Sequence, residues 1–261
     1  MFKPGGITPA EMPLVISIVG MVALLILERA IPASLAGRDA VVGHAARNLG
    51  LGLVNGLAVA LVATPLLVGV SLWIGQAQFG LLRGLGSPWR IVVGLLLFDA
   101  WMYLWHRANH QLGLLWRFHR LHHQDEAMDV TTTVRFHPVE IMLSTLARLV
   151  VMPLLGLTIG ELVIYEMVMF PVILFHHSNI RFPERIDRVL RVLIVTPAVH
   201  RIHHSVDRIE TDSNYGSILA VWDRLGRTFR LRDDQRPVVF GLAGENHPAE
   251  GKAAQRWATR G

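Results

Sequence analysis

Long apolar stretches separated by short polar segments occupy the first two thirds of the chain. A helix needs about 20 predominantly apolar residues to cross a bilayer, and five stretches approach this length, at residues 12–27, 49–74, 91–105, 141–157 and 161–175. Pro65 interrupts the second stretch, and residues 156–160 provide a turn between the last two. Nothing in the pattern suggests strands. The pattern predicts an all-α polytopic membrane protein with about four to five transmembrane helices.

The first apolar stretch has two interpretations. It is short, it ends at Glu28-Arg29, and small residues follow it, as they do in a cleaved signal peptide. The segment before it, however, carries only Lys3 against Glu11, and a signal peptide normally begins with a clear positive charge. We therefore expect a retained span, with a signal peptide as the alternative.

The arginines set the expected orientation in the membrane. Cytoplasmic connections of membrane proteins are enriched in Lys and Arg. Here arginines follow the first, third and fifth stretches, whereas the other connections hold only Arg83 and Arg90. The three groups are Arg29, Arg38 and Arg47; Arg107, Arg117, Arg120 and Arg135; and Arg181, Arg185, Arg188 and Arg191. An outward N-terminus places all three groups on the cytoplasmic side. We expect a multi-pass protein of a bacterial inner membrane, with a helical cap on its cytoplasmic face.

The composition agrees with a membrane protein. Of the 261 residues, 52% are hydrophobic and only 17% are charged, and the mean hydropathy is +0.40. A large soluble helical protein is the alternative that this composition disfavours. The pI of about 10.4 does not indicate nucleic-acid binding, because the basic residues flank apolar stretches. The chain has no cysteine, which excludes disulfides, thiolate zinc sites and iron–sulfur clusters.

Histidine spacing carries the chemistry. All but two of the thirteen histidines lie between His106 and His204. His106 and His110 share one face of a helix, and the pattern H-x-x-H-H occurs twice, at His119, His122 and His123 and at His200, His203 and His204. Residues at i, i+3 and i+4 lie within about 100° of helical arc, so we expect the imidazoles of each motif to point the same way. His44 and His247 are isolated and receive no assignment.

Such a concentration of imidazoles indicates metal binding. Clustered histidines repel one another when protonated and need hydrogen-bond partners when buried and neutral. A transition metal satisfies both requirements, and eight or more imidazoles suit two ions rather than one. Two alternatives have less support. A zinc-dependent membrane hydrolase would need His-Glu-x-x-His, which is absent. A non-enzymatic metal-binding protein such as a transporter would place its ligands at mid-membrane.

The chain resembles the fatty acid hydroxylase superfamily, which includes sterol desaturases and alkylglycerol monooxygenase. The resemblance covers about residues 95 to 230 and rests on three motifs and two supporting segments. The motifs are His106-Arg107-Ala108-Asn109-His110, His119-Arg120-Leu121-His122-His123 and His200-Arg201-Ile202-His203-His204. The supporting segments are Phe175-His176-His177-Ser178-Asn179 and Asp212-Ser213-Asn214-Tyr215-Gly216, the latter followed by Trp222-Asp223-Arg224-Leu225. Gly226-Arg227 departs from the Phe-Gly that the family often has at this point.

The resemblance implies a centre of two iron ions that activates dioxygen, with zinc as a possible substitute metal. The implied ligands are His106, His110, His119, His122, His123, His177, His200, His203 and His204. The implied reaction is hydroxylation of a lipid C–H bond, with desaturation as the alternative. The substrate class stays open among sterol, fatty acyl, ether lipid and carotenoid. Because no flavin, haem or iron–sulfur signature is present, electrons would come from a cytochrome b5-like protein or from a ferredoxin with its reductase.

Several further residues are candidates for a supporting role. His137 precedes Pro138, and His176 is an extra histidine beside His177, so either is a possible additional ligand or hydrogen-bond partner. Asp99 lies two helical turns before His106, within an apolar span where a carboxylate is expensive. Metal-bound imidazoles commonly donate a hydrogen bond to a carboxylate or carbonyl. The candidates for this role are Asp99, Asp207, Asp212 and Asn214.

We divide the chain into three parts. Residues 1–90 form the N-terminal spans, residues 91–236 form a fatty acid hydroxylase-like catalytic domain, and residues 237–261 form a C-terminal tail.

Overall fold

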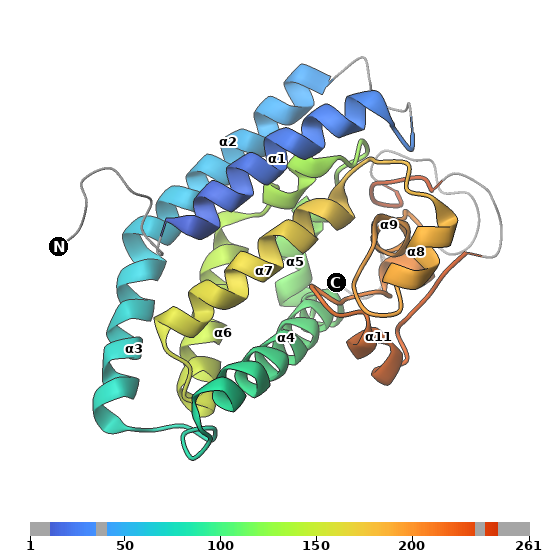
Figure 1. The fold of residues 1–261 in the computed structure, drawn as a ribbon. Helices are drawn as coiled ribbons and strands as arrows, with labels where there is room; N and C mark the ends of the chain where they lie inside the picture. The colour runs from blue at the N-terminus through green and yellow to red at the C-terminus, as the bar shows by residue number, and fades with distance from the viewer. Residues whose placement is uncertain (1–10, 35–40, 233–237, 245–261) are drawn as a thin grey trace.

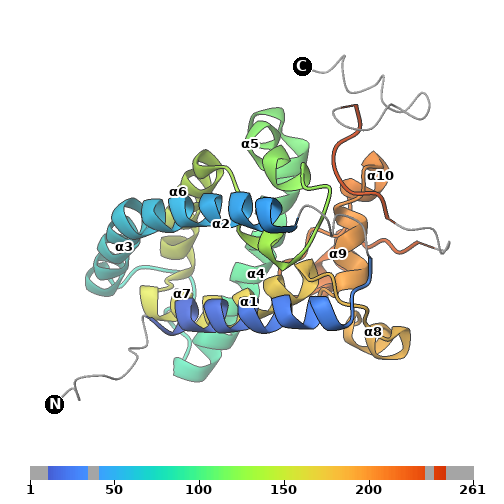
Figure 2. The same ribbon diagram turned by 90° about the horizontal axis from the view of Figure 1, so that it is seen from above.

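The computed structural model describes residues 11–34, 41–232 and 238–244 (Figure 1). These residues form helices and three isolated β-bridges but no strand, which confirms the all-α prediction. Most of the predicted C-terminal tail lies outside the described residues. Long helices form a bundle, and shorter helices form a cap at one end of it (Figures 1 and 2). The long helices are α1 (Met12–Ala30), α2 (Val41–Ala58), α3 (Thr64–Ala77), α4 (Ser87–Gln111), α6 (Pro138–Leu155) and α7 (Ile159–His177).

Five helical segments are long and apolar enough to cross a membrane, at Met12–Ala30, Gly43–Ala77, Pro88–Gln111, Pro138–Leu155 and Ile159–His177. The prediction of five apolar spans is confirmed. The second is longer than expected, at 35 residues, because α2 and α3 are continuous through a π-helical turn at Val59–Ala63. Extra backbone in a π turn and a following proline both bend helices. Pro65 follows directly, and the chain changes direction between α2 and α3 (Figure 1).

The end of the bundle away from the cap is closed by two tight turns. Gly156 ends α6 in the left-handed conformation, with φ 78°, which costs a residue without a side chain little. A β-carbon on Gly80 would lie 2.2 Å from the Gly156 Cα. Leu81 and Leu82 donate backbone hydrogen bonds to Leu154 and Leu155. The two connections therefore pack backbone against backbone, which requires glycine.

The cap is built from the ends of the spans and the segments between them. Glu28, near the end of α1, is buried and accepts hydrogen bonds from the backbone N–H groups of Val130 (2.9 Å) and Asn179 (2.5 Å). It thus ties α1 to two cap segments. The cap elements are α5 (Gly113–His123), η3 (Val130–Val134), α8 (Glu184–Leu190), α9 (Pro197–His203), α10 (Arg208–Thr211) and α11 (Val221–Leu225).

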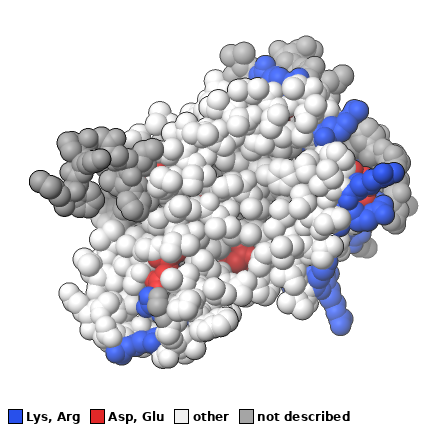
Figure 3. All heavy atoms as spheres, in the orientation of Figure 1, with Lys and Arg blue, Asp and Glu red and all other residues white. Residues whose placement is uncertain are grey.

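Most of the charged side chains lie toward the ends of the molecule. In the view of Figure 3 most blue atoms lie at the cap end, a few lie at the opposite end, and the surface between is almost entirely uncharged. Large apolar side chains on the spans are exposed, among them Leu61 (74%), Leu53 (66%) and Ile26 (65%). Such an apolar belt fits a lipid environment. Within the belt, Arg148 on α6 and Glu166 on α7 pair with each other at 3.9 Å.

Candidate metal centre

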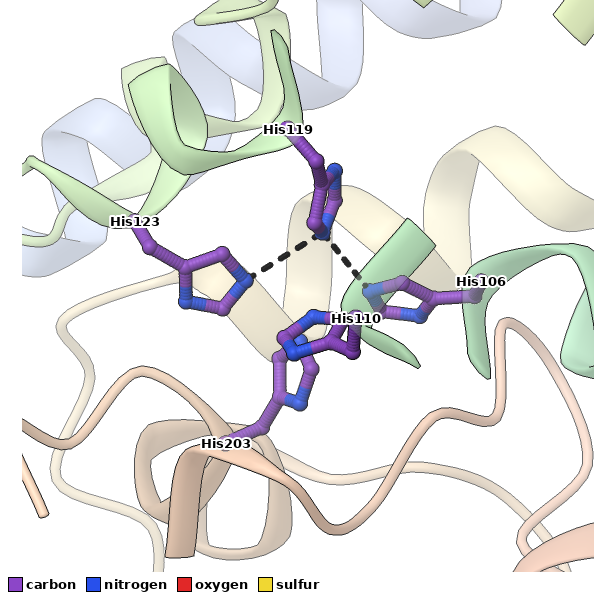
Figure 4. Close-up of side chains that lie close together, drawn as sticks. All are labelled: His106, His110, His119, His123 and His203. Atoms are coloured by element: carbon purple, nitrogen blue, oxygen red, sulfur yellow. Dashed lines mark hydrogen bonds between the residues drawn. The ribbon is translucent and has the colours of Figure 1, made fainter. Parts of the chain in front are cut away.

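Nine histidines converge in two buried groups where the cap meets the spans. His106, His110, His119, His123 and His203 form the first group, and His122, His177, His200 and His204 form the second. Within each group one ligand atom from every residue lies within 4.8 Å of the others. The two groups together contain the nine histidines that the resemblance implied as ligands, and leave out His137 and His176. Figure 4 shows the five imidazoles of the first group turned toward one another.

The helices explain how distant residues meet. His106 and His110 lie in the last turns of α4, and His177 is the last residue of α7. The two H-x-x-H-H motifs lie on α5 and on α9 with its C-cap, His204. Each motif is divided between the groups, which the expectation of a common direction did not anticipate. His119 and His123 join the first group and His122 joins the second. The two groups are therefore neighbours. The ring of His123, in the first group, stacks on the ring of His204, in the second, with the ring centroids 4.5 Å apart.

The Nε2 atoms face inward. His106 and His123 place Nε2 3.2 Å from the Nε2 of His119. In the second group the Nε2 of His200 lies 3.0 Å from that of His177 and 3.2 Å from that of His204. Imidazole lone pairs that face one another repel unless a proton or a cation lies between them. Two nitrogens bound to one ion, each at about 2.0–2.1 Å, would lie about 3 Å apart, so these spacings suit shared metal ions.

In three of the nine imidazoles the Nδ1 atom points outward to a backbone carbonyl. The rings of His106, His177 and His203 donate to the backbone carbonyls of Tyr215 (2.9 Å), Ile173 (2.9 Å) and Ser213 (2.7 Å). An N–H on Nδ1 leaves the Nε2 lone pair free for a metal. His110 has no hydrogen-bond partner for either ring nitrogen, although its Nδ1 lies 3.5 Å from Asp212 Oδ1. A buried imidazole without a partner is costly, and a metal ligand role removes that cost.

Burial keeps the cap imidazoles neutral. Burial lowers the pKa of His203 to about 3, against a weaker raising effect from its hydrogen bond to Ser213. Burial and the neighbouring imidazoles lower the pKa of His122, His123, His200 and His204 well below the ordinary value. Neutral imidazole is the form that binds metal. The donor set and its protonation state therefore fit a pair of transition-metal ions.

Glu140 is a supporting residue that the sequence analysis missed. Its Oε1 accepts a 2.6 Å hydrogen bond from His119 Nδ1, and both side chains are buried. Glu140 lies in the first turn of α6, which the sequence pattern presented only as the start of a span. The one available signal was an acidic residue close to the histidine-rich segment.

The proposed additional ligands lie beside the groups. His137 caps α6, since its Nδ1 accepts from the Val139 N–H at 3.1 Å, and its ring packs 5.0 Å from Phe118. His176 is buried and stacks on His200, with ring centroids 4.0 Å apart and an interplanar angle of 10°. It belongs to neither group.

Four polar residues were predicted to hydrogen-bond the imidazoles, and three of them bond elsewhere. Asp99 accepts hydrogen bonds from Tyr165 (2.8 Å) and Trp222 (2.7 Å), and so fastens α4 to α7 and to the cap rather than to an imidazole. Asp207 is exposed and caps α10 through the Ile209 N–H. Asn214 has φ 55° and bonds to the backbone of Val199 and Arg230. Of the four, Asp212 alone approaches an imidazole of the two groups, that of His110.

His44, which received no assignment, belongs to a buried polar network behind α5. Its Nε2 lies 2.7 Å from Asp125 Oδ1, and Asn48 and Thr132 donate to the other oxygen of Asp125 at 3.1 and 2.7 Å. Burial raises the pKa of Asp125, but the hydrogen bonds from His44 and Thr132 outweigh it and lower the pKa to about 2. The network joins α2 to the segment that follows the first H-x-x-H-H motif.

The family model for fatty acid hydroxylase matches residues 91–228, more than half of the chain and all nine of these histidines. The chain belongs to the fatty acid hydroxylase family. This confirms the resemblance inferred from the three motifs. The matched region contains both histidine groups. Because the described spans agree with the apolar pattern, the fatty acid hydroxylase chain is a multi-pass membrane protein.

Curated relatives carry lipid-oxidising names. The ornithine lipid hydroxylase OlsE of Rhizobium tropici is 30% identical over 156 residues, which is 60% of this chain and 46% of the relative. The alkylglycerol monooxygenase of Homo sapiens is 27% identical over 169 residues, 62% of this chain and 34% of the relative. The lathosterol oxidase of Homo sapiens is 28% identical over 158 residues, 60% of this chain and 49% of the relative. The alignments thus span less than half of these relatives. No solved structure matches the chain.

Proposed function

We propose that this chain is a membrane-bound di-iron oxidoreductase that uses dioxygen to hydroxylate a C–H bond of a lipid. The observation that carries the proposal is the convergence of nine imidazoles, eight of them buried, in groups of five and four, where the spans meet the cap. Membership of the fatty acid hydroxylase family and the lipid-oxidising names of the relatives support it.

The chain's own residues would hold and shield the metal pair. Nε2 atoms would bind the two ions, and the outward hydrogen bonds of His106, His119 and His203 would fix each ring. Two iron ions bound there would supply the redox chemistry that activates dioxygen. The buried position of the groups would exclude bulk water, which protects a reactive centre from side reactions.

The substrate would reach the centre from the bilayer. His106 and His177 lie at the ends of membrane-spanning helices, so a lipid chain could approach the metals without leaving the membrane. The sterol, fatty acyl, ether-lipid and carotenoid classes stay open. Desaturation is the alternative outcome, because removal of one hydrogen begins both reactions.

We also propose a membrane location, an electron donor and a domain division for this chain. The charge pattern supports an inner-membrane location with the metal site on the cytoplasmic face. Electrons would come from a cytochrome b5-like protein or from a ferredoxin with its reductase, and zinc could substitute for iron without redox activity. The division into residues 1–90, 91–236 and 237–261 is likewise a proposal, and the family match at residues 91–228 supports a catalytic unit that begins at residue 91.

Metal analysis and lipid analysis test the function together. The full chain is purified in detergent for elemental analysis, and the lipids of cells that express it are compared with those of cells expressing His203→Ala, both grown under ¹⁸O₂. Two irons per chain and a lipid that gains one labelled oxygen support the proposal. A lipid that loses two hydrogens supports desaturation. Zinc alone, with no oxygen-dependent change in any lipid, would overturn both and favour a hydrolase or a metal-binding protein.

A further inference from the structure

Trp116 on α5 connects the first histidine group to the surface of the cap. Its indole contacts three imidazoles of that group, with ring centroids 5.0 Å from His110, 5.5 Å from His123 and 6.2 Å from His119. These three imidazoles are buried, whereas Trp116 is only partly buried. One side chain therefore contacts both the proposed metal ligands and the surroundings of the protein.

The sequence of α5 gives this helix a histidine face and a basic face. His119 and His123 lie three and seven residues after Trp116, which places all three on the same side of the helix. Arg120 lies one turn after Trp116, and the exposed Arg117 lies on the outward side of the helix. The sequence of α5 contains no acidic residue. Trp116 thus lies at the border between the metal ligands and a positively charged surface.

The surface at the start of α5 is open and apolar. Leu112 is 56% exposed and Leu114 is 70% exposed. A β-carbon on Gly113 would meet no atom of the described residues within 4 Å. Exposed apolar side chains beside tryptophan and arginine are the composition that distinguishes protein–protein interfaces from the rest of a protein surface.

The arginines of α8 form a second basic region of the cap, but their own helix largely neutralises them. Arg191 pairs with Asp187 at 2.7 Å and with Glu184 at 3.0 Å, and Arg188 lies 3.7 Å from Glu184. No residue of α8 belongs to either histidine group. Charge and contact with the histidines therefore both favour α5 over α8 as the place where an acidic partner would bind.

We propose that the face of α5 around Trp116 docks an acidic one-electron carrier protein, and that electrons enter the first histidine group there. The docking face consists of Leu112, Leu114, Trp116, Arg117 and Arg120. The inference rests on the proposed function and gives its electron donor a place on the chain. Opposite charges on two surfaces steer such encounters, and redox partners bury less than about 1,200 Å² in total, an area that suits one short helix and its preceding turn.

The electron transfer needs no covalent step. In each encounter one electron leaves the reduced centre of the carrier and reduces one iron of the pair, while no bond forms or breaks. Two encounters supply two electrons. The chain itself has no cysteine for an iron–sulfur cluster, so a docked carrier is the source that the proposal names.

The test measures carrier binding separately from turnover. The full-length chain, purified in detergent with zinc in place of iron, is titrated with two acidic probes, the soluble haem domain of a cytochrome b5 and a [2Fe–2S] ferredoxin. The variants are Arg117→Glu and Trp116→Leu. Arg188→Glu is the matched control, because it makes the same charge change at a cap arginine whose side chain is 72% exposed. The iron-loaded forms are then reduced either by the reduced probe or by dithionite, and the two rates are compared.

We expect one probe to bind the unmodified chain and Arg188→Glu with the same affinity. Arg117→Glu should weaken binding at least about tenfold at low ionic strength, and added salt should reduce the difference. Trp116→Leu should weaken binding about tenfold, as truncation of a central interface tryptophan does. At saturating carrier, it should also lower the rate of reduction by the carrier relative to the rate with dithionite.

Three results would overturn the proposal. The first is that neither probe binds the unmodified chain, and the second is that Arg117→Glu and Arg188→Glu weaken binding equally. The third is that Trp116→Leu leaves the membrane fraction while carrier binding is unchanged, which would make Trp116 an anchor at the lipid surface. If the iron-loaded chain accepts no electron from dithionite, the proposed function fails, while the titration of the zinc form still decides the docking face.

Discussion

Glu140 and His119 form a carboxylate–imidazole pair in the interior of the cap, with Glu140 Oε1 2.6 Å from His119 Nδ1. The pair turns the other nitrogen of His119 toward the Nε2 atoms of His106 and His123. His119 thus stands at the centre of the first group, and Glu140 orients it from behind. A carboxylate in this position also makes the imidazole a stronger metal ligand.

Replacing Glu140 with glutamine should weaken the metal site. The amide keeps the size of the side chain but removes its charge, so we expect metal affinity to fall about 10- to 100-fold. Competition with a chelator measures this directly on the purified chain. Glu126→Gln is the control, because Glu126 is exposed in the same region. Equal metal retention by both variants would show that Glu140 does not support the site.

Single ligand replacements should remove one ion at a time. His203 belongs to the first group and His200 to the second. The metal content of His203→Ala and of His200→Ala should therefore fall from two toward one metal per chain. Both should lose lipid oxidation at least about 100-fold, because the proposed reaction needs the pair. Elemental analysis with the lipid assay checks both effects. Loss of both ions in each variant would contradict the separation into two groups.

Acid should destabilise the metal-free chain below neutral pH. The folded-state pKa of His203 is about 3, while an unfolded imidazole titrates near 6.5. The unfolded chain then binds more protons between these values, so stability is complete above about pH 6.5 and is lost as the pH falls toward 3. Each such imidazole contributes a slope of up to about 1.4 kcal/mol per pH unit.

Thermal unfolding of the chelator-treated chain at pH 7.5 and pH 5.5 measures this dependence. His203→Gln removes one titrating group and should give a smaller difference between the two pH values. An unfolding temperature that is the same at both pH values would mean that these imidazoles are solvated in the metal-free chain.

Asp125→Asn should lower stability without directly removing a ligand. Asp125 is buried and paired with His44, and loss of one partner of a buried pair costs about 3–5 kcal/mol. We expect a lower unfolding temperature. The control is Asp207→Asn, since Asp207 is an exposed helix cap and asparagine caps equally well. Equal unfolding temperatures for the two variants would exclude a stabilising role for the network.

The sequence by itself determined the spans and the set of nine histidines that converge. Apolar length sets where helices cross, because backbone groups in lipid must bond within their own helix. The spacing of His119, His122 and His123 predicted that these three imidazoles take part in one site, because helical periodicity is a local property of the sequence. The shared histidine motifs were also enough to identify the family.

Only the tertiary structure decided how these residues combine. α5 packs against α4, and α9 packs against α7. This packing divides each H-x-x-H-H motif between the two groups, and helical spacing alone carries no information on it. Glu140 contacts His119 although 21 positions of sequence separate them, and Asp99 accepts a hydrogen bond from Trp222 instead of from one of the nine histidines. Such contacts depend on which helix faces pack together, and packing is a property of the whole fold rather than of any segment.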